Sequence, residues 1–164
     1  RQRGREVMTA VAAEFPDISI FSYRLFSDML GLLDSGNLEL ALEPDLPSAS
    51  MDRDALLQVL VNLVDNAIKF AANAQDKRIV LQARAVGTEL VLSVRDHGPG
   101  VPAGQLRRIF QPFYRGEREL TRRTKGTGIG LALVAGLVQR MGGRVDARNH
   151  PAGGLEVRVV LAGA

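Results

Sequence analysis

The stretch from Asp52 to Ala71, DRDALLQVLVNLVDNAIKFA, constrains the fold more than any other part of the chain. It contains no Gly or Pro, Asp52 is a favourable N-cap residue, and Asp54 suits the positive end of a helix dipole. Its large apolar side chains fall on one broad arc of a helix: Leu56, Val59, Leu60, Leu63, Val64, Ala67, Ile68 and Phe70. We therefore predict one long helix that buries this arc.

A narrow polar stripe runs along the other side of the same predicted helix. At roughly 100° per residue, Asn62, Asn66 and Lys69 fall within about 60° of one another. Two amides and an ammonium beside so much apolar surface need partners. Either solvent covers this stripe as an ordinary outer face or a ligand binds to it, and the helix alone does not decide between the two.

Composition limits the classes of protein to consider. The 164 residues suffice for one domain with a full hydrophobic core, and 46% apolar with 24% charged residues is typical of globular proteins. The absence of cysteine excludes disulfides and thiolate metal sites. No apolar run approaches the ~20 residues that a membrane-spanning helix needs. The chain begins with Arg rather than Met, so we expect it to be a piece of a longer protein.

The chain is moderately basic, with a net charge of +3. Its basic residues gather at Arg1–Arg5, Arg107–Arg108 and Arg115–Lys125. Aromatic residues make up only 5% of the chain and do not alternate with the basic ones, as stacking on bases would require. We therefore expect a solvated or phosphate-directed basic loop and no nucleic-acid partner.

Periodicity predicts the other elements. Helical spacing is found at 4–14, 18–34, 103–110 and 128–141, and strand-like segments at 38–43, 78–85, 89–96, 145–148 and 155–161. Residues 116–127 are polar and charged, which predicts a mobile surface loop. The fold class is α/β: a two-layer sandwich with a mixed, mostly antiparallel sheet of about five strands, three main helices on one face, and an extra N-terminal helical segment. Residues 1–36 would form that segment and 37–164 the main domain.

Two glycine-rich segments stand at element boundaries. Asp96-x-Gly98-x-Gly100 follows a predicted strand, and Gly126-x-Gly128-x-Gly130 leads into a predicted helix. Glycine lets a backbone approach a ligand closely, and a helix N-terminus offers unpaired N–H groups to a phosphate. Neither spacing is that of the dinucleotide fingerprint or the P-loop. Each segment is also common as an ordinary turn, and a carboxylate such as Asp96 is often a turn-former.

The order of these segments resembles the ATP-binding catalytic domain of sensor histidine kinases, in the superfamily that also holds gyrase, mismatch-repair and chaperone ATPases. NLVDNAIKF is similar to the family's asparagine box and DHGPGVP to its first glycine box. IFQPFYRG is similar to its phenylalanine box and GTGIGLALV to its second glycine box. All four occur in the family's order, and the resemblance covers about residues 38–161.

The resemblance implies roles for individual residues. Asn66 would hold a magnesium ion that bridges the phosphates, with Asn62 beside it, and amide oxygens suit this hard cation. Lys69 would reach the phosphate oxygens, and Asp96 would accept a hydrogen bond from the adenine amino group. Phe110 and Phe113 would anchor a lid loop that spans about 101–127. Arg115 and Lys125 would stabilise charge on the transferred phosphoryl group. Gly126, Gly128 and Gly130 would hold the phosphates through backbone N–H groups.

The resemblance thus implies a full set of site residues. Asn62, Lys69 and Arg115 would be catalytic, and Asn66 and Asn62 would bind the metal. The residues that would bind ATP are Asn62, Asn66, Lys69, Asp96, Gly98, Gly100, Val101, Phe113, Tyr114, Arg115, Lys125, Gly126, Thr127, Gly128, Ile129, Gly130 and Leu131.

Asn62 also bears on the type of reaction. Members of the superfamily that hydrolyse ATP resemble one another in having a glutamate there, which activates water, whereas an amide is not a useful base. The resemblance therefore implies a protein-histidine kinase domain that binds Mg-ATP and donates the γ-phosphoryl to a histidine. His97 and His150 lack the His-Glu-x-x-Thr-Pro context of the acceptor, so we expect the acceptor on a dimerisation domain absent from this chain.

The implied setting is a two-component phosphorelay. The expected partners are ATP, the histidine-bearing dimerisation domain of the same protein and a response regulator, with a homodimeric full-length protein. We expect a cytoplasmic domain, which a membrane anchor elsewhere in the protein could hold. Two alternatives stay open. One is a regulatory nucleotide-binding module without phosphotransfer, since Leu155 stands where many members have Thr near the adenine pocket. The other is an anti-sigma-type serine kinase, which would be expected to have a carboxylate at Asn62.

Overall fold

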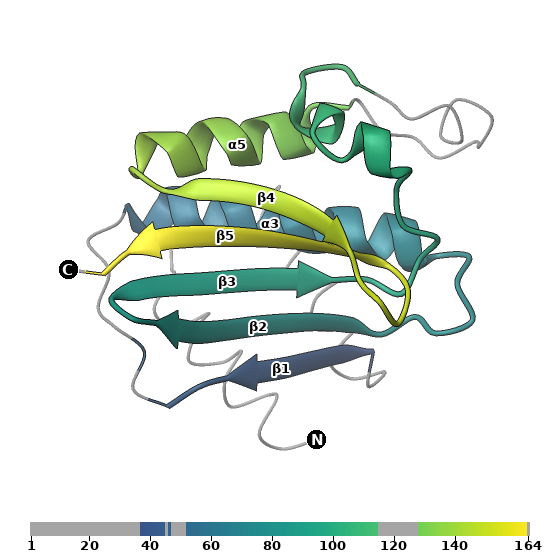
Figure 1. The fold of residues 1–164 in the computed structure, drawn as a ribbon, viewed down its shortest axis with the longest axis horizontal. Coiled ribbons are helices and arrows are strands. Elements are labelled where there is room, and N and C mark those ends of the chain that lie inside the picture. The colour runs from purple at the N-terminus through teal and green to yellow at the C-terminus, as the bar shows by residue number, and fades with distance from the viewer. Residues whose placement is uncertain (1–36, 45, 47–51, 115–127, 164) are drawn as a thin grey trace.

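A computed structural model of the protein describes residues 37–44, 46, 52–114 and 128–163. Within these ranges the order of elements is β1, α3, β2, β3, η1, η2, α5, β4 and β5, where η marks a short 3-10 helix (Figure 1). The helices predicted at 4–14 and 18–34, and most of the loop predicted at 116–127, lie outside the described residues.

The five strands form one sheet in the order β1-β2-β3-β5-β4. Their bounds are β1 Leu38–Leu42, β2 Ile79–Val86, β3 Glu89–Arg95, β4 Arg144–Asn149 and β5 Leu155–Ala162. β1 runs parallel to β2, and every other neighbouring pair is antiparallel. The sheet is therefore mixed and mostly antiparallel, which confirms the predicted fold class.

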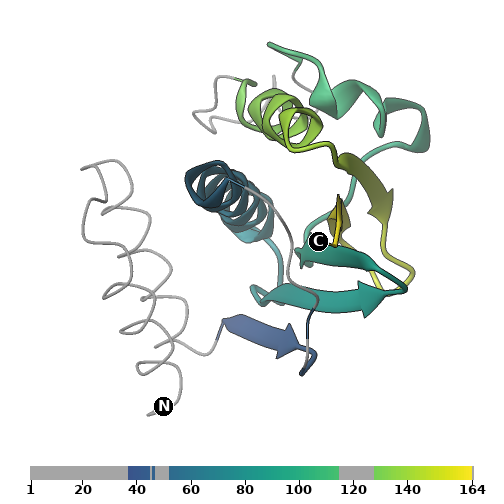
Figure 2. The same ribbon diagram turned by 90° about the vertical axis from the view of Figure 1, so that its left-hand side faces the viewer.

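Two α-helices of this part of the chain lie side by side on one face of the sheet (Figures 1 and 2). α3 spans Arg53–Ala71 and α5 spans Gly130–Arg140. Asp52 caps α3 as predicted, because its Oδ1 accepts hydrogen bonds from the backbone N–H groups of Asp54 (2.9 Å) and Ala55 (3.1 Å). The uninterrupted apolar arc and this cap explain why α3 reaches its predicted length.

The core lies between the helices and the inner face of the sheet. Val59 and Val64 of α3, Val134 and Val138 of α5, and Val159 of β5 are fully buried there. Alternate residues of β3 and β5 point into this core, as the period of two predicts. Burial of the α3 arc fixes the rotation of the helix, so its polar stripe turns away from the sheet.

One predicted helix is wrong. Residues 103–110 form two single-turn 3-10 helices, η1 Ala103–Gln105 and η2 Arg108–Phe110, neither of which contains a fully buried residue. An eight-residue segment is too short to form a stable helix without packing, and Gly104 lowers its helix propensity further. In the described ranges, no helix is long and apolar enough to cross a membrane.

Candidate functional site

The polar stripe of α3 is half-buried at Asn62 and Asn66 and exposed at Lys69. The Asn62 side chain donates a hydrogen bond from its Nδ2 to the Gln58 carbonyl oxygen (2.7 Å). The Oδ1 atom of Asn62 takes no part in this bond. That oxygen faces the start of α5, because a Cβ atom at Gly130 would lie 3.3 Å from it. The first turn of α5 therefore lies beside the stripe.

The other two stripe residues differ in their contacts. The Asn66 side chain makes no hydrogen bond to the part of the chain that the structure describes. Lys69 forms an ion pair with Asp65, four residues back on the same helix. Lys69 would therefore have to exchange Asp65 for a phosphate in order to take its predicted role.

Asp96 directly follows β3 and is 3% exposed. Its Oδ1 accepts two backbone hydrogen bonds, from the N–H groups of Gly98 (2.7 Å) and Leu155 (3.2 Å). Oδ2 accepts none from the described part of the chain. Burial raises the pKa of the Asp96 carboxyl above its usual range, and the two backbone bonds offset part of that rise. A buried carboxylate with one uncommitted oxygen is suited to accept a hydrogen bond from a ligand donor.

The glycines after Asp96 let the chain approach its neighbours closely. A Cβ atom at Gly98 would lie 2.7 Å from the Phe70 carbonyl oxygen, so this loop packs on the last turn of α3. Gly100 has φ +68°, and a Cβ there would lie 2.6 Å from Oδ1 of Asn149. Both positions exclude a side chain, and Gly100 also needs the left-handed backbone region that glycine tolerates.

The second glycine-rich segment is described from Gly128 onward. The Gly128 carbonyl oxygen accepts a hydrogen bond from the Phe113 N–H (3.0 Å), which joins the two ends of the 114–128 stretch. α5 then begins at Gly130, and its N-cap residue Ile129 makes no side-chain capping hydrogen bond. An uncapped helix N-terminus offers backbone N–H groups and a positive dipole end to an anion.

The structure therefore brings both glycine-rich segments to α3. The first contacts α3 at Phe70 and the second faces Asn62. Asn66 lies on the helix between these two points. A nucleotide with its base near Asp96 and its phosphates near Gly130 would extend along the polar stripe.

Several other predicted site residues contact neighbouring parts of the protein in the structure. Leu131 is buried in the core, so only its backbone faces outward. The N–H of Val101 is committed to Asn149. Phe113 was expected to anchor the lid, but its side chain is 76% exposed at φ 63°, and its anchoring contact is the backbone bond to Gly128. Tyr114 stacks against the guanidinium of Arg108, 4.8 Å from the ring centroid. Arg115, Lys125, Gly126 and Thr127 lie outside the described residues.

The sequence reasoning missed the contribution of the turn between β4 and β5. Residues 149–154 were predicted only as a turn. In the structure a Cβ at Gly154 would lie 1.8 Å from the Asp96 carbonyl oxygen, and the backbone of Leu155 bonds to Asp96 in both directions. The Gly153-Gly154 pair was the one signal in the sequence, and a glycine pair in a turn does not reveal which segment it approaches.

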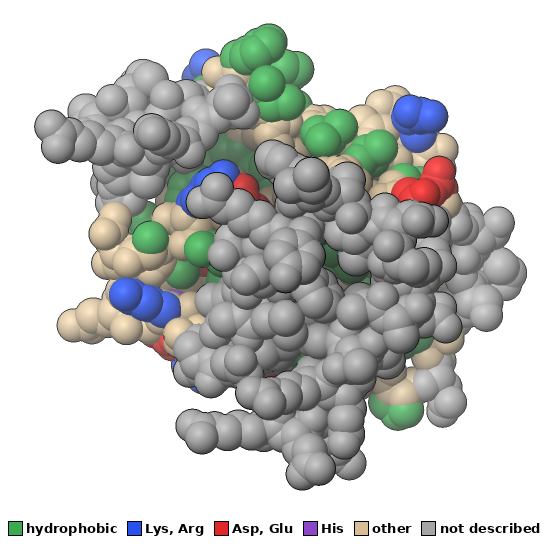
Figure 3. All heavy atoms as spheres, turned by 180° about the vertical axis from the view of Figure 1, so that it is seen from behind, with side chains coloured by type: hydrophobic (Ala, Val, Ile, Leu, Met, Phe, Trp, Pro, Cys, Tyr) green, Lys and Arg blue, Asp and Glu red, His purple; other side chains and the backbone are tan. Residues whose placement is uncertain are grey.

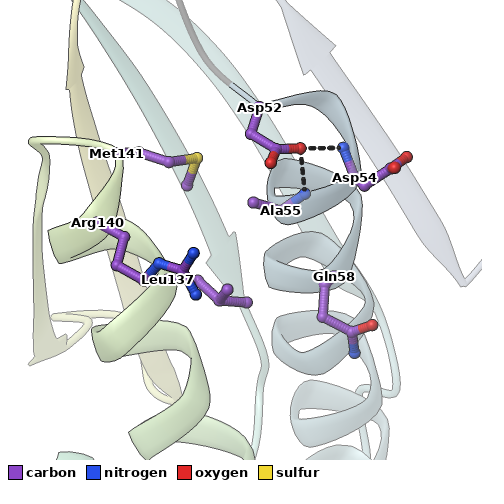
Figure 4. Close-up of a pocket in the computed structure, with 7 residues that line it drawn as sticks. All are labelled: Asp52, Asp54, Ala55, Gln58, Leu137, Arg140 and Met141. Carbon is purple, nitrogen blue, oxygen red and sulfur yellow. Dashed lines mark hydrogen bonds between the residues drawn. The ribbon is translucent and has the colours of Figure 1, made fainter.

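A separate hollow of about 320 Å³ lies between the N-terminal end of α3 and the C-terminal end of α5 (Figure 4). None of the residues predicted to bind a nucleotide lines it. Its lining residues are Asp52, Asp54, Ala55, Gln58, Leu137, Arg140 and Met141. In the part of the chain that the structure covers, no group of three or more His, Asp or Glu residues could hold a metal ion.

Comparisons with known proteins identify the family of the chain. Residues 51–163 match the family described as histidine kinase-, DNA gyrase B-, and HSP90-like ATPase. The sensor histidine kinase AruS of Pseudomonas aeruginosa is 36% identical over 165 residues, which cover 92% of this chain and 16% of AruS. The chain thus corresponds to a small part of that relative.

Two solved structures are similar as well. Full-length ShkA in complex with AMPPNP has 28% identity and a TM-score of 0.64, over 90% of this chain and 31% of that chain. The catalytic domain of the histidine kinase ThkA has 24% identity and a TM-score of 0.65, over 97% of this chain and 93% of that chain. The chain therefore belongs to the histidine kinase-, gyrase B- and HSP90-like ATPase family, as an ATP-binding catalytic domain of the sensor histidine kinase type.

Proposed function

We propose that this domain binds Mg-ATP and donates the γ-phosphoryl group to a histidine on a dimerisation domain outside this chain. The buried Asp96 carboxylate carries the proposal, because it keeps one oxygen uncommitted at the edge of a glycine loop that packs on α3. The adenine amino group would donate to that oxygen. The phosphates would then lie toward the uncapped start of α5, which can bind them through backbone N–H groups.

The residues present fit a magnesium ion between helix and phosphates. Mg²⁺ prefers hard oxygen ligands and retains much of its water, so one or two amide oxygens are enough when phosphates supply the rest. Asn66 has a side chain with no committed partner in the described ranges, and Asn62 keeps its Oδ1 free of the Gln58 bond. Bound Mg²⁺ would neutralise phosphate charge and help to orient the transferred group.

Transfer to a side chain is favoured over hydrolysis by the chemistry of Asn62. A water molecule attacking the γ-phosphoryl group needs a base, and an amide does not accept a proton at neutral pH. Lys69, Arg115 and Lys125 would supply positive charge to the phosphates. In that role Lys69 would leave Asp65, and the exchange is feasible because both side chains of that pair are partly exposed.

An apolar surface beside the phosphate end would receive the acceptor domain. Phe113, Ile129 and Leu133 are 76%, 42% and 40% exposed. Phe113 is hydrogen-bonded to Gly128, the residue before Ile129, and Leu133 lies one helical turn after Ile129. Hydrophobic side chains are visible over the α5 edge of the molecule in Figure 3. Such clustered exposure marks an interaction site. A homodimeric parent protein and a downstream response regulator complete the proposal.

The metal requirement can be tested by titrating the chain with ATP in the presence and absence of Mg²⁺. We expect Asn66→Asp to weaken Mg-ATP binding by about tenfold, because it places a negative charge where a neutral amide faces phosphates. Gln139→Glu, an exposed change on α5 away from the stripe, is the matched control. Unchanged binding in Asn66→Asp would contradict the proposed site.

Phosphotransfer is tested separately by adding the histidine-bearing segment of the parent protein and ATP labelled on the γ-phosphate. We expect labelled protein with the wild-type domain. Leu133→Asp should lower the label severalfold while ATP affinity stays the same, because it charges the docking surface only. Tight ATP binding with no label in the wild type would instead support a regulatory nucleotide-binding module.

A further inference from the structure

The loop from Asp96 to Val101 has little regular structure of its own. It packs on the end of α3, and among the described residues it makes most of its hydrogen bonds to the segment that joins β4 and β5. That segment contacts the loop at two separate places. At the first, Leu155 and Gly154 hold Asp96, and at the second, the side chain of Asn149 holds Val101.

Asn149 is the last residue of β4, and its side-chain amide forms two hydrogen bonds to the backbone of one residue. Its Oδ1 accepts from the Val101 N–H (2.9 Å), and its Nδ2 donates to the Val101 carbonyl oxygen (2.6 Å). These two residues are 48 positions apart in the sequence. The amide thus pairs with both backbone polar groups of Val101, as the backbone of a neighbouring strand would.

Gly100 shows that this contact shapes the loop. A Cβ at position 100 would lie 2.6 Å from Oδ1 of Asn149, so the amide occupies the space of a missing side chain. The φ of +68° at Gly100 turns the chain so that Val101 meets Asn149 with both its N–H and its carbonyl. The glycine and the amide therefore form one unit, in which each requires the other.

We propose that Asn149 is a positioning residue, whose paired hydrogen bonds to Val101 hold the Gly98–Val101 backbone in the conformation that receives the adenine of ATP. The inference rests on the proposed function, and it assigns Asn149 no contact with the nucleotide. The loop is held at Asp96 by burial, at His97 by a hydrogen bond between its Nδ1 and the Arg78 carbonyl oxygen, and at Gly98 by packing on the end of α3. Asn149 holds the other end of the loop at Val101. Loss of that contact frees the backbone from Gly98 to Val101, which must then be ordered when the nucleotide binds.

The position of Asn149 separates this role from a purely structural one. The residue is exposed, so water can replace its hydrogen bonds when the side chain is removed. We therefore expect Asn149→Ala to change the unfolding midpoint little and to weaken Mg-ATP binding by roughly three- to tenfold. Gln139→Glu on α5 should change neither quantity.

Asn149→Asp adds a second measurement, the pH dependence of Mg-ATP affinity. A purely structural role of Asn149 would not change this quantity. The carboxylate keeps the acceptor for the Val101 N–H, but it opposes the Val101 carbonyl oxygen where the amide donated. Protonation restores a donor at that point. The affinity of Asn149→Asp for Mg-ATP, divided by that of the wild type at the same pH, should therefore recover as the pH falls from about 6 toward about 4, where an exposed aspartate begins to protonate.

Protonation of the introduced carboxylate would also relieve its repulsion of the phosphates. Asn149→Ala carries no charge, so a loss of Mg-ATP affinity in that variant does not come from repulsion. Mg-ATP binding by Asn149→Ala within twofold of the wild type would overturn the inference. A ratio of affinities for Asn149→Asp that does not change over this pH range would overturn it as well, even if Asn149→Ala does not fold. Failure of the wild type to bind Mg-ATP would instead refute the proposed function, so the two failures are distinguishable.

Discussion

The two glycine-rich segments differ in how many elements hold them. The first, from Asp96 to Val101, is held by the end of α3 and by the β4–β5 turn, with Asp96 buried. The second, described from Gly128 to Gly130, has one backbone bond to Phe113 and leads into a helix without a side-chain cap. Folding thus fixes the first loop at several points, while the second segment has N–H groups with no partner among the described residues.

Because of this difference, we expect the two segments to bind different parts of a nucleotide that lies along the polar stripe of α3. A base is recognised by directional hydrogen bonds, which require donors and acceptors fixed in advance. A triphosphate is held by charge and by several N–H groups, which an open helix terminus provides without further side chains. Substitutions at the first loop should therefore act on base recognition, and also on stability where they fill a close backbone contact, whereas substitutions at the second should act on phosphate binding.

Gly154→Ala should have the largest effect. Its Cβ would lie 1.8 Å from the Asp96 carbonyl oxygen, and φ at this position is +89°, so backbone must move. We expect a loss of about 3 to 5 kcal/mol in the free energy of unfolding, measured by urea denaturation, because a steric clash combines with left-handed strain. A loss below about 1 kcal/mol would show that the first loop is not held as tightly as described.

Asp96→Asn should separate base recognition from stability. The amide oxygen can still accept from Gly98 and Leu155, but an NH₂ group would replace the oxygen offered to the adenine amino donor. We expect ATP affinity to fall by about 100-fold, since two donors then face each other in a buried site. The free energy of unfolding should be no lower than that of the wild type, because the variant no longer buries a charge. Calorimetric titration and urea denaturation measure the two quantities.

The pH dependence of stability provides an independent check on Asp96. Burial raises its folded-state pKa, so the folded protein holds this proton more tightly than the unfolded chain does. The stabilising contribution of Asp96 is therefore complete at low pH and is lost as the pH rises through the raised pKa. The stability of Asp96→Asn relative to the wild type should accordingly increase from about pH 3.5 upward and level off above that pKa. A constant difference would mean that Asp96 is not desolvated.

Gly130→Ala tests the second segment and should have the smallest effect. Its Cβ would lie 3.3 Å from Oδ1 of Asn62, a tight contact that a small shift can relieve. We expect stability within about 1 kcal/mol of the wild type and ATP affinity lowered by about threefold, because the methyl group borders the phosphate path. Gly136→Ala is the matched control: it lies on the same helix, no atom lies within 4 Å of its Cβ position, and it should raise stability by about 0.5–1 kcal/mol without changing ATP affinity.

Much of this domain was predictable from local sequence. The bounds and cap of α3, the strands from β1 to β5 and the inward-facing residues follow from periodicity and from turn residues such as Gly87, because burial of an apolar face fixes helix and strand orientation. The order of the four motifs was enough to indicate the family, which the comparisons confirm. Local pattern was insufficient at residues 103–110, where two 3-10 turns replace the expected helix.

Only the tertiary structure decided what holds the predicted site. Asn149, Gly154 and Leu155 lie more than 45 positions after the Asp96 loop in the chain, and antiparallel pairing of β3 with β5 brings them to it. The sequence determined that Asp96 follows a strand and that glycines surround it. Whether its carboxylate is buried, and which of its oxygens remains available, depends on strands that pair across the sheet, since desolvation and hydrogen bonding are properties of the packed neighbourhood rather than of the residue.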